Sequence, residues 1–138
     1  MKPIVVDSSV TVKWLNGVDE KYLKQADKLL KDAQAGTVNI LAPELSKYEI
    51  GNALLNKCLD LPKAYESLGT VYILPIIFIP ETRELAIQTY RFALQSGITY
   101  YDATFVALAK REKAVLVTDN PKHQGKQLDV AVVPLKNY

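Results

Sequence analysis

Five short apolar runs, rich in β-branched residues, alternate along this chain with longer helix-like segments, and this alternation constrains the fold most. The apolar runs lie at residues 4–6, 39–42, 76–79, 114–117 and 130–133. Helical patterns lie between them, at residues 10–15, 19–35, 44–57, 62–72, 81–95 and 101–111. The runs are continuously apolar, which is typical of strands buried on both faces. We therefore predict an α/β fold with a parallel sheet that helices cover on both faces.

Length, charge and cysteine content set the broad class. The chain has 138 residues, 49% of them hydrophobic, which suits a single domain over residues 1–138 with a real core. Seventeen lysines and arginines against 15 acids give a net charge of +2, too small to indicate nucleic-acid binding by itself. The single cysteine, Cys58, excludes internal disulfides. With no signal peptide and no apolar run near the roughly 18 residues of a membrane span, we expect a cytoplasmic protein without membrane contact.

Two aspartates follow predicted strands. Asp7 comes directly after the run at 4–6, and Asp119 follows the run at 114–117 by one threonine. In open α/β sheets, ligands gather at the carboxyl ends of the strands. Both residues also have ordinary structural explanations, because Asp7 suits a helix N-cap and Asp119-Asn120-Pro121 suits a turn.

Two further acids lie on helix faces that should pack inward. Glu49 shares a face with Leu45, Tyr48 and Asn52, and Asp102 lies over core-like positions one turn further along its own helix. An unpaired carboxylate on such a face is costly. Here too a structural alternative stays open, since Asp102 is a candidate N-cap and Glu49 suits a solvated rim.

If these four carboxylates converge, a cation must neutralise them. Close carboxylates repel one another and take up protons unless a positive charge is present. The ligands are all oxygen atoms, without a His or Cys cluster, which favours Mg²⁺ or Mn²⁺ over zinc. A hard divalent ion held this way suits phosphodiester hydrolysis, where it orients the phosphate and activates water.

Four blocks of the sequence resemble those of PIN domains, most closely the VapC toxins of prokaryotic toxin–antitoxin pairs. They agree in order and spacing over essentially the whole chain. The blocks are Val-Val-Asp-Ser-Ser-Val at 5–10, Pro-Glu-Leu-Ser-Lys-Tyr-Glu-Ile-Gly-Asn-Ala-Leu at 43–54, Tyr-Asp-Ala-Thr-Phe-Val-Ala-Leu-Ala at 101–109 and Leu-Val-Thr-Asp-Asn at 116–120.

The resemblance implies a three-layer α/β/α sandwich with a five-stranded parallel sheet. It also implies an acidic catalytic pocket formed by Asp7, Glu49, Asp102 and Asp119, in which Asp7 and Asp102 bind magnesium directly. Ser9 matches a small polar residue that supports the pocket, and Thr118 matches the threonine before the fourth acid. VapC-like proteins are Mg²⁺-dependent endoribonucleases that cleave RNA, usually form homodimers and are silenced by a VapB-type antitoxin.

The sequence departs from the family pattern at the fourth acid. The family often places this acid two residues after the threonine, a position that Asn120 occupies here, while Asp119 stands one residue earlier. Either Asp119 fills the role on a shifted loop, or Asn120 replaces it as a neutral ligand.

Several cations and tyrosines have two interpretations each. Lys13, Lys47, Lys122 and Lys126 either contact phosphates or are ordinary solvated lysines. Tyr100 and Tyr101 suit core or dimer packing better than base stacking.

Two other functions remain as alternatives. A phospho-receiver domain also has an acid after its first strand, but it needs an acidic pair there, where this chain has Ser8 and Ser9. A PIN-fold protein that processes RNA without being a toxin, or that only binds RNA or protein, has the same sequence signature.

Overall fold

The computed structural model describes residues 1–124 and 129–138, and it contains one sheet of five parallel strands in the order β3-β2-β1-β4-β5. Val5 in the central strand pairs with Leu41 on one side and Leu116 on the other. The strands are β1 (Lys2–Val6), β2 (Val38–Pro43), β3 (Ile76–Ile79), β4 (Val115–Thr118) and β5 (Val132–Pro134). The predicted parallel sheet is confirmed, with every predicted apolar run contributing a strand.

Helices fill the connections between the strands. They are α1 (Ser8–Leu15), α2 (Leu23–Gln34), α3 (Leu45–Asn56), α4 (Leu61–Val71), α5 (Arg83–Ser96), α6 (Tyr100–Arg111) and α7 (Pro121–Gln124), with a 3₁₀ turn η1 at Leu135–Asn137. Side-chain caps define several helix starts: Asp7 caps α1, Asp60 caps α4, Thr82 caps α5 and Thr99 caps α6. The N-cap alternative therefore holds for Asp7 and is wrong for Asp102, because Thr99 occupies that position.

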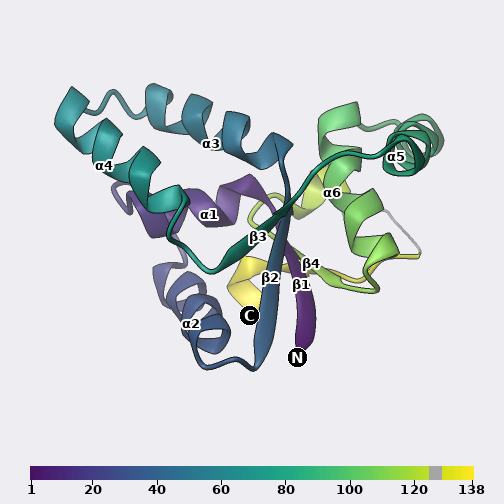
Figure 1. Cartoon of the computed structure of the whole chain (residues 1–138), viewed down its shortest axis with the longest axis horizontal. Helices are drawn as coiled ribbons and strands as arrows, with labels where there is room; N and C mark the ends of the chain where they lie inside the picture. Colours follow the sequence, from purple (N-terminus) through teal and green to yellow (C-terminus); the bar gives the residue numbers. More distant parts are fainter. Residues whose placement is uncertain (125–128) are drawn as a thin grey trace.

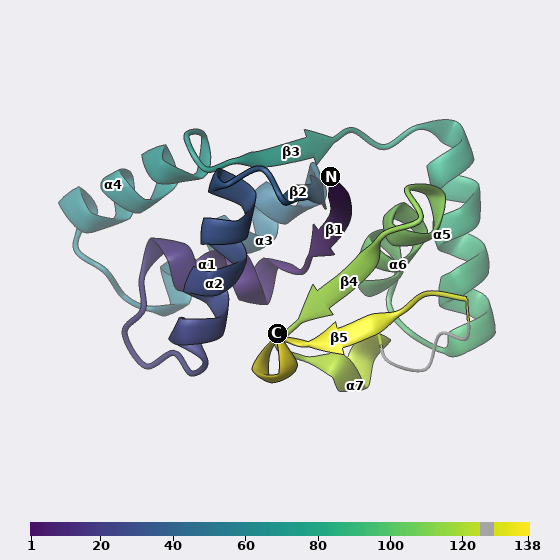
Figure 2. The same cartoon turned by 90° about the horizontal axis from the view of Figure 1, so that it is seen from below.

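Successive residues of each strand point to opposite faces of the sheet and build two cores. On one face, Val5, Leu41 and Leu116 pack against α5 and α6, including Phe92 and Phe105. On the other face, the neighbouring strand residues Ile4, Ile40 and Val117 pack against α1 and α2. Figures 1 and 2 show α5 and α6 on one side of the sheet and α1 and α2 on the other. The three-layer α/β/α architecture is thus confirmed.

A third, smaller cluster joins the helices that flank α1. Val12 packs with Ile50 and Leu54 of α3 and with Val71 of α4. Figure 1 shows α3 and α4 extending beside α1, away from α5 and α6. As a result α1 is surrounded on nearly every side, and five of its eight residues are buried.

The described part of the chain has no helix long and apolar enough to cross a bilayer. Part of the predicted turn-rich segment at 119–128 forms α7, while Lys126 lies outside the described residues.

Candidate active site

Asp7 stands where β1 passes into α1, at the carboxyl edge of the central strand. Its Oδ2 atom accepts hydrogen bonds from the Ser9 hydroxyl at 2.6 Å, from the Ser9 backbone N–H at 3.3 Å and from the Thr118 hydroxyl at 3.3 Å. No hydrogen bond from the described residues reaches the other carboxylate oxygen, Oδ1. One oxygen of Asp7 is therefore fixed by the fold, while the other faces away from these donors.

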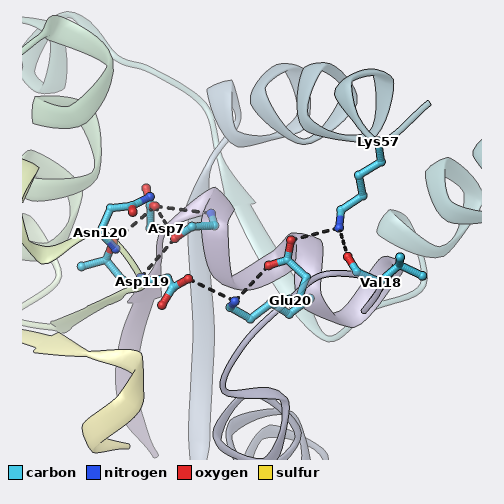
Figure 3. A network of polar contacts seen from close by, with 9 residues as sticks. Asp7, Val18, Glu20, Lys57, Asp119 and Asn120 are labelled. Atoms are coloured by element: carbon cyan, nitrogen blue, oxygen red, sulfur yellow. Dashed lines mark hydrogen bonds and ion pairs between the residues drawn. The ribbon is translucent and has the colours of Figure 1, made fainter. Parts of the chain in front are cut away.

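Two consecutive backbone amides orient the hydroxyls that hold Asp7. The N–H of Asp119 donates to Ser9 Oγ at 3.1 Å, and the N–H of Asn120 donates to Thr118 Oγ1 at 3.0 Å. Because each hydroxyl accepts from an amide, its single hydrogen is available for Asp7. Figure 3 shows this turn after β4 lying directly beside Asp7. The supporting positions predicted for Ser9 and Thr118 thus coincide with real contacts to Asp7.

Glu49 is half-buried on α3, and the charges of Asp7 and Asp102 act on its carboxyl group. Burial is the largest influence and raises the pKa of its carboxyl group; a hydrogen bond from Ser8 lowers it, and the charges of Asp7 and Asp102 raise it further. The net shift is upward. Three acids that are distant in sequence therefore influence one another at one end of the sheet.

A pair of serines supports Glu49, and the sequence analysis did not identify them. The Ser8 hydroxyl donates to Glu49 Oε1 at 2.8 Å and lies 2.9 Å from the hydroxyl of Ser46, which is fully buried. Since Ser8 gives its hydrogen to Glu49, Ser46 is the donor to Ser8. The available signal in the sequence was a serine, Ser46, one helical turn before Glu49 on the same predicted helix face.

Asp102 lies in the first turn of α6, three residues after the capping Thr99. Its backbone N–H donates to the Thr99 hydroxyl at 3.0 Å, and the residue is half-buried. A helix N-terminus carries partial positive charge, which favours an ionised carboxylate there.

The carboxylate of Asp119 has a different environment from the other three. Its Oδ2 atom lies 3.1 Å from Lys13 Nζ, and Lys13 also pairs with Glu20 at 2.9 Å. In Figure 3 this carboxylate lies on the side of Glu20, while Asn120 lies next to Asp7. Asn120 is exposed. The turn thus brings both residues to the site, but the charge of Asp119 is directed to an ion pair.

Two lysines considered for phosphate contacts are already engaged. The Lys13 side chain is only 1% exposed and lies between two carboxylates. Lys47 pairs with Glu44 at 2.7 Å and lies over the rings of Tyr72 and Phe78. The phosphate interpretation is therefore wrong for Lys13, whose ammonium group solvent barely reaches.

The model of the PIN domain family matches residues 4–126. This chain belongs to the PIN-domain family. Among curated proteins, no sequence matches it.

Solved structures share the fold of this PIN domain over most of its length. VapBC2 from Rickettsia felis, bound to a DNA fragment from its promoter, has a TM-score of 0.72 at 15% identity, covering 96% of this chain and 98% of that one. PAE2754 from Pyrobaculum aerophilum gives 0.70 at 23% identity, with coverages of 96% and 84%. VapC20 from Mycobacterium tuberculosis, described as a sarcin-ricin loop cleaving toxin, gives 0.63 at 17% identity, with coverages of 84% and 87%.

The donor set of this PIN domain fits a hard divalent ion bound with few protein ligands. Among the described residues, no three His, Cys, Asp or Glu side chains are placed to hold one metal ion jointly. Magnesium does not require three, since it usually keeps several waters and takes one or two carboxylates plus substrate phosphate oxygens. Asp7 offers Oδ1 for this purpose. Burial is the main reason for the raised pKa of Glu49, but the charges of Asp7 and Asp102 raise it further, and a cation would relieve that repulsion.

Proposed function

We propose that the whole chain, residues 1–138, is a single PIN domain that acts as a divalent-metal-dependent endoribonuclease and as the toxin of a VapBC-type pair. The observation that carries the proposal is the arrangement at Asp7. One carboxylate oxygen is held by three hydrogen bonds, and two other acids act on the same site electrostatically. Mg²⁺ is the proposed ion, with Mn²⁺ as a substitute, and the activity belongs to the cytoplasm, where RNA is available.

Each acid has a distinct proposed role. Asp7 and Asp102 would hold the metal ion, which would supply charge neutralisation at the phosphodiester and activate a water molecule. Glu49 is the proposed proton acceptor, because a raised pKa brings a carboxyl group closer to the range useful for acid–base catalysis. Ser9 and Thr118 orient Asp7. Asp119 and Asn120 complete the pocket through the turn after β4, whose backbone amides orient the hydroxyls of Ser9 and Thr118.

The choice of RNA as substrate is supported by family membership and by one structural neighbour. VapC20 from Mycobacterium tuberculosis is described as a sarcin-ricin loop cleaving toxin. The small net charge of +2 gives no independent support, so the proposed contacts with RNA are local ones at the acidic pocket rather than a broad basic surface.

Two exposed apolar stripes support the proposed partners, a second copy of the chain and a VapB-type antitoxin. Ile87, Tyr90 and Leu94 recur at spacings of three and four on α5 and are all exposed. Another stripe lies on α4, made of Leu61, Tyr65 and Leu68. Such faces on a small domain are typical of interfaces. For the homodimer, light scattering should give a mass near twice the 15.4 kDa of one chain, and a monomeric mass would contradict it.

The proposed catalysis is tested by conservative substitutions at the two proposed metal ligands. Asp7→Asn and Asp102→Asn should each abolish RNA cleavage in Mg²⁺ while leaving the circular dichroism spectrum unchanged. Asp27→Asn is the matched control, because Asp27 is an exposed aspartate on α2, away from the site. Cleavage by either site variant at the rate of the unmodified protein would remove the mechanism.

The toxin role requires a separate experiment. Induced expression of the chain in a bacterial host should arrest growth, and expression of the Asp7→Asn variant should not. RNA cleavage in vitro without growth arrest would instead favour a PIN-domain nuclease that processes RNA and is not a toxin.

A further inference from the structure

Lys13 is a buried cation in the last turn of α1. Its side chain is 1% exposed, and five of the eight residues of α1 are buried. A buried charge is tolerated only when it is paired and hydrogen-bonded. Lys13 meets this requirement with two carboxylates, Glu20 at 2.9 Å and Asp119 at 3.1 Å.

The charges around Lys13 balance without any external ion. Glu20 also pairs with Lys57 at 2.9 Å, and Lys57 donates a further hydrogen bond to the Val18 carbonyl at 2.7 Å. Burial alone would raise the pKa of Glu20, but the hydrogen bonds from Lys13 and Lys57 and the charges of these lysines together outweigh burial and lower the pKa. Figure 3 shows the four side chains as one connected line of contacts from Lys57 to Asp119. Two cations and two anions thus form a closed network beside the acidic site.

Asp119 connects this network to Asp7 through its own backbone. Its side chain binds Lys13, and its N–H orients the hydroxyl of Ser9, which donates to Asp7 at 2.6 Å. The next amide, that of Asn120, orients the Thr118 hydroxyl toward the same oxygen of Asp7. The turn that carries these two amides is therefore held at its first residue by the ion pair with Lys13.

We propose that Lys13 is a positioning residue: by anchoring the Asp119 side chain, it fixes the turn whose amides orient both hydroxyls on Asp7. This inference rests on the proposed function, since it concerns the ability of Asp7 to bind a divalent ion. Lys13 would act through Asp119 rather than by contacting the ion, and the Asp119 carboxylate that it engages would take no direct part in holding the metal.

The experiment measures Mn²⁺ affinity by titration calorimetry on the full chain, comparing Lys13→Met with Lys57→Met. Both variants remove one cation from the same network, but only Lys13 contacts Asp119. We expect Lys13→Met to weaken Mn²⁺ binding about tenfold or more, as loss of a supporting contact around a metal ligand typically does. Lys57→Met should bind Mn²⁺ as the unmodified protein does.

Three results would overturn the inference. Equal affinity of Lys13→Met and unmodified protein would show that Lys13 only stabilises the fold. Equal weakening in both variants would show a general loosening rather than positioning. Absence of Mn²⁺ binding by the unmodified protein would overturn the inference together with the metal-dependent function, whereas the first two results leave that function intact.

If Lys13→Met does not fold, a second pair of variants tests whether Lys13 anchors the Asp119 side chain. Asp119→Asn keeps an oxygen that accepts a hydrogen bond from Lys13, and Asp119→Ala does not. An anchoring role predicts that Asn retains most of the Mn²⁺ affinity and that Ala loses it. Equal loss in both would identify the Asp119 charge itself as a metal ligand and refute the anchoring role.

Discussion

The hydroxyl of Ser9 makes the shortest hydrogen bond to Asp7. The loss of unfolding free energy on removing this hydroxyl can be worked out from its contacts. Ser9→Ala deletes the 2.6 Å hydrogen bond to a carboxylate, a class that contributes about 1.5–3 kcal/mol. It also leaves the Asp119 N–H without its acceptor, which costs about 1 kcal/mol at a half-buried site where water has partial access. Alanine regains about 0.5 kcal/mol of helix propensity in α1. The net loss of unfolding free energy is about 2–3.5 kcal/mol.

Urea denaturation at pH 7 with a metal chelator measures this loss, since the chelator removes any contribution from bound ions. A domain of this size loses about 4 °C of Tm per kcal/mol, so a thermal scan should show a decrease near 10 °C. The matched control is Ser67→Ala, which removes a buried hydroxyl that donates to the neutral Leu15 carbonyl at 3.3 Å. The control should cost about 1 kcal/mol or less. If Ser9→Ala costs no more than the control, Ser9 does not hold Asp7 as described.

Three further predictions follow from the same geometry. Thr11→Val should stabilise the protein by about 1 kcal/mol in urea denaturation, because the buried Thr11 hydroxyl has no hydrogen-bond partner among the described residues; a loss would mean that this hydroxyl is satisfied. Glu49→Gln should raise the metal-free stability at pH 7. Because the pKa of Glu49 is raised in the folded state, the unmodified protein gains stability as pH falls through that pKa. The difference in unfolding free energy between Glu49→Gln and the unmodified protein should therefore shrink toward low pH. A difference that grows toward low pH would contradict the raised pKa. Mg²⁺ at 100 times its Kd should stabilise the unmodified protein by about 2.7 kcal/mol and Asp7→Asn hardly at all; equal stabilisation would place the ion elsewhere.

Much of the fold was predictable because burial on both faces leaves a simple sequence signal. The runs at 4–6 and 76–79 gave strands within two residues of β1 and β3, and continuous apolarity predicted their parallel arrangement. The ends of the helices were less accurate. The helix predicted from residue 19 begins at Leu23, after a left-handed residue at Tyr22, which no hydrophobic period reveals.

The closeness of Asp7, Glu49 and Asp102 was predictable from the sequence, but the contacts that hold these acids were not. Strand ends located Asp7, and an acid on an inward helix face located Glu49. The partners of these acids depend on contacts between distant segments, such as Ser8 with Ser46, that a single sequence does not specify. Lys13 was misinterpreted as a surface cation, because its pairing with Glu20 and Asp119 depends on contacts between segments that a single sequence does not specify.

The central claim is that a divalent ion binds at Asp7 with Asp102 as its second protein ligand. A crystal structure of the chain soaked in Mn²⁺, with anomalous scattering recorded to locate the metal, tests this directly. We predict an anomalous peak at the carboxylates of Asp7 and Asp102. A peak at another acidic cluster, or no peak at millimolar Mn²⁺, would contradict the account and leave only the PIN fold established.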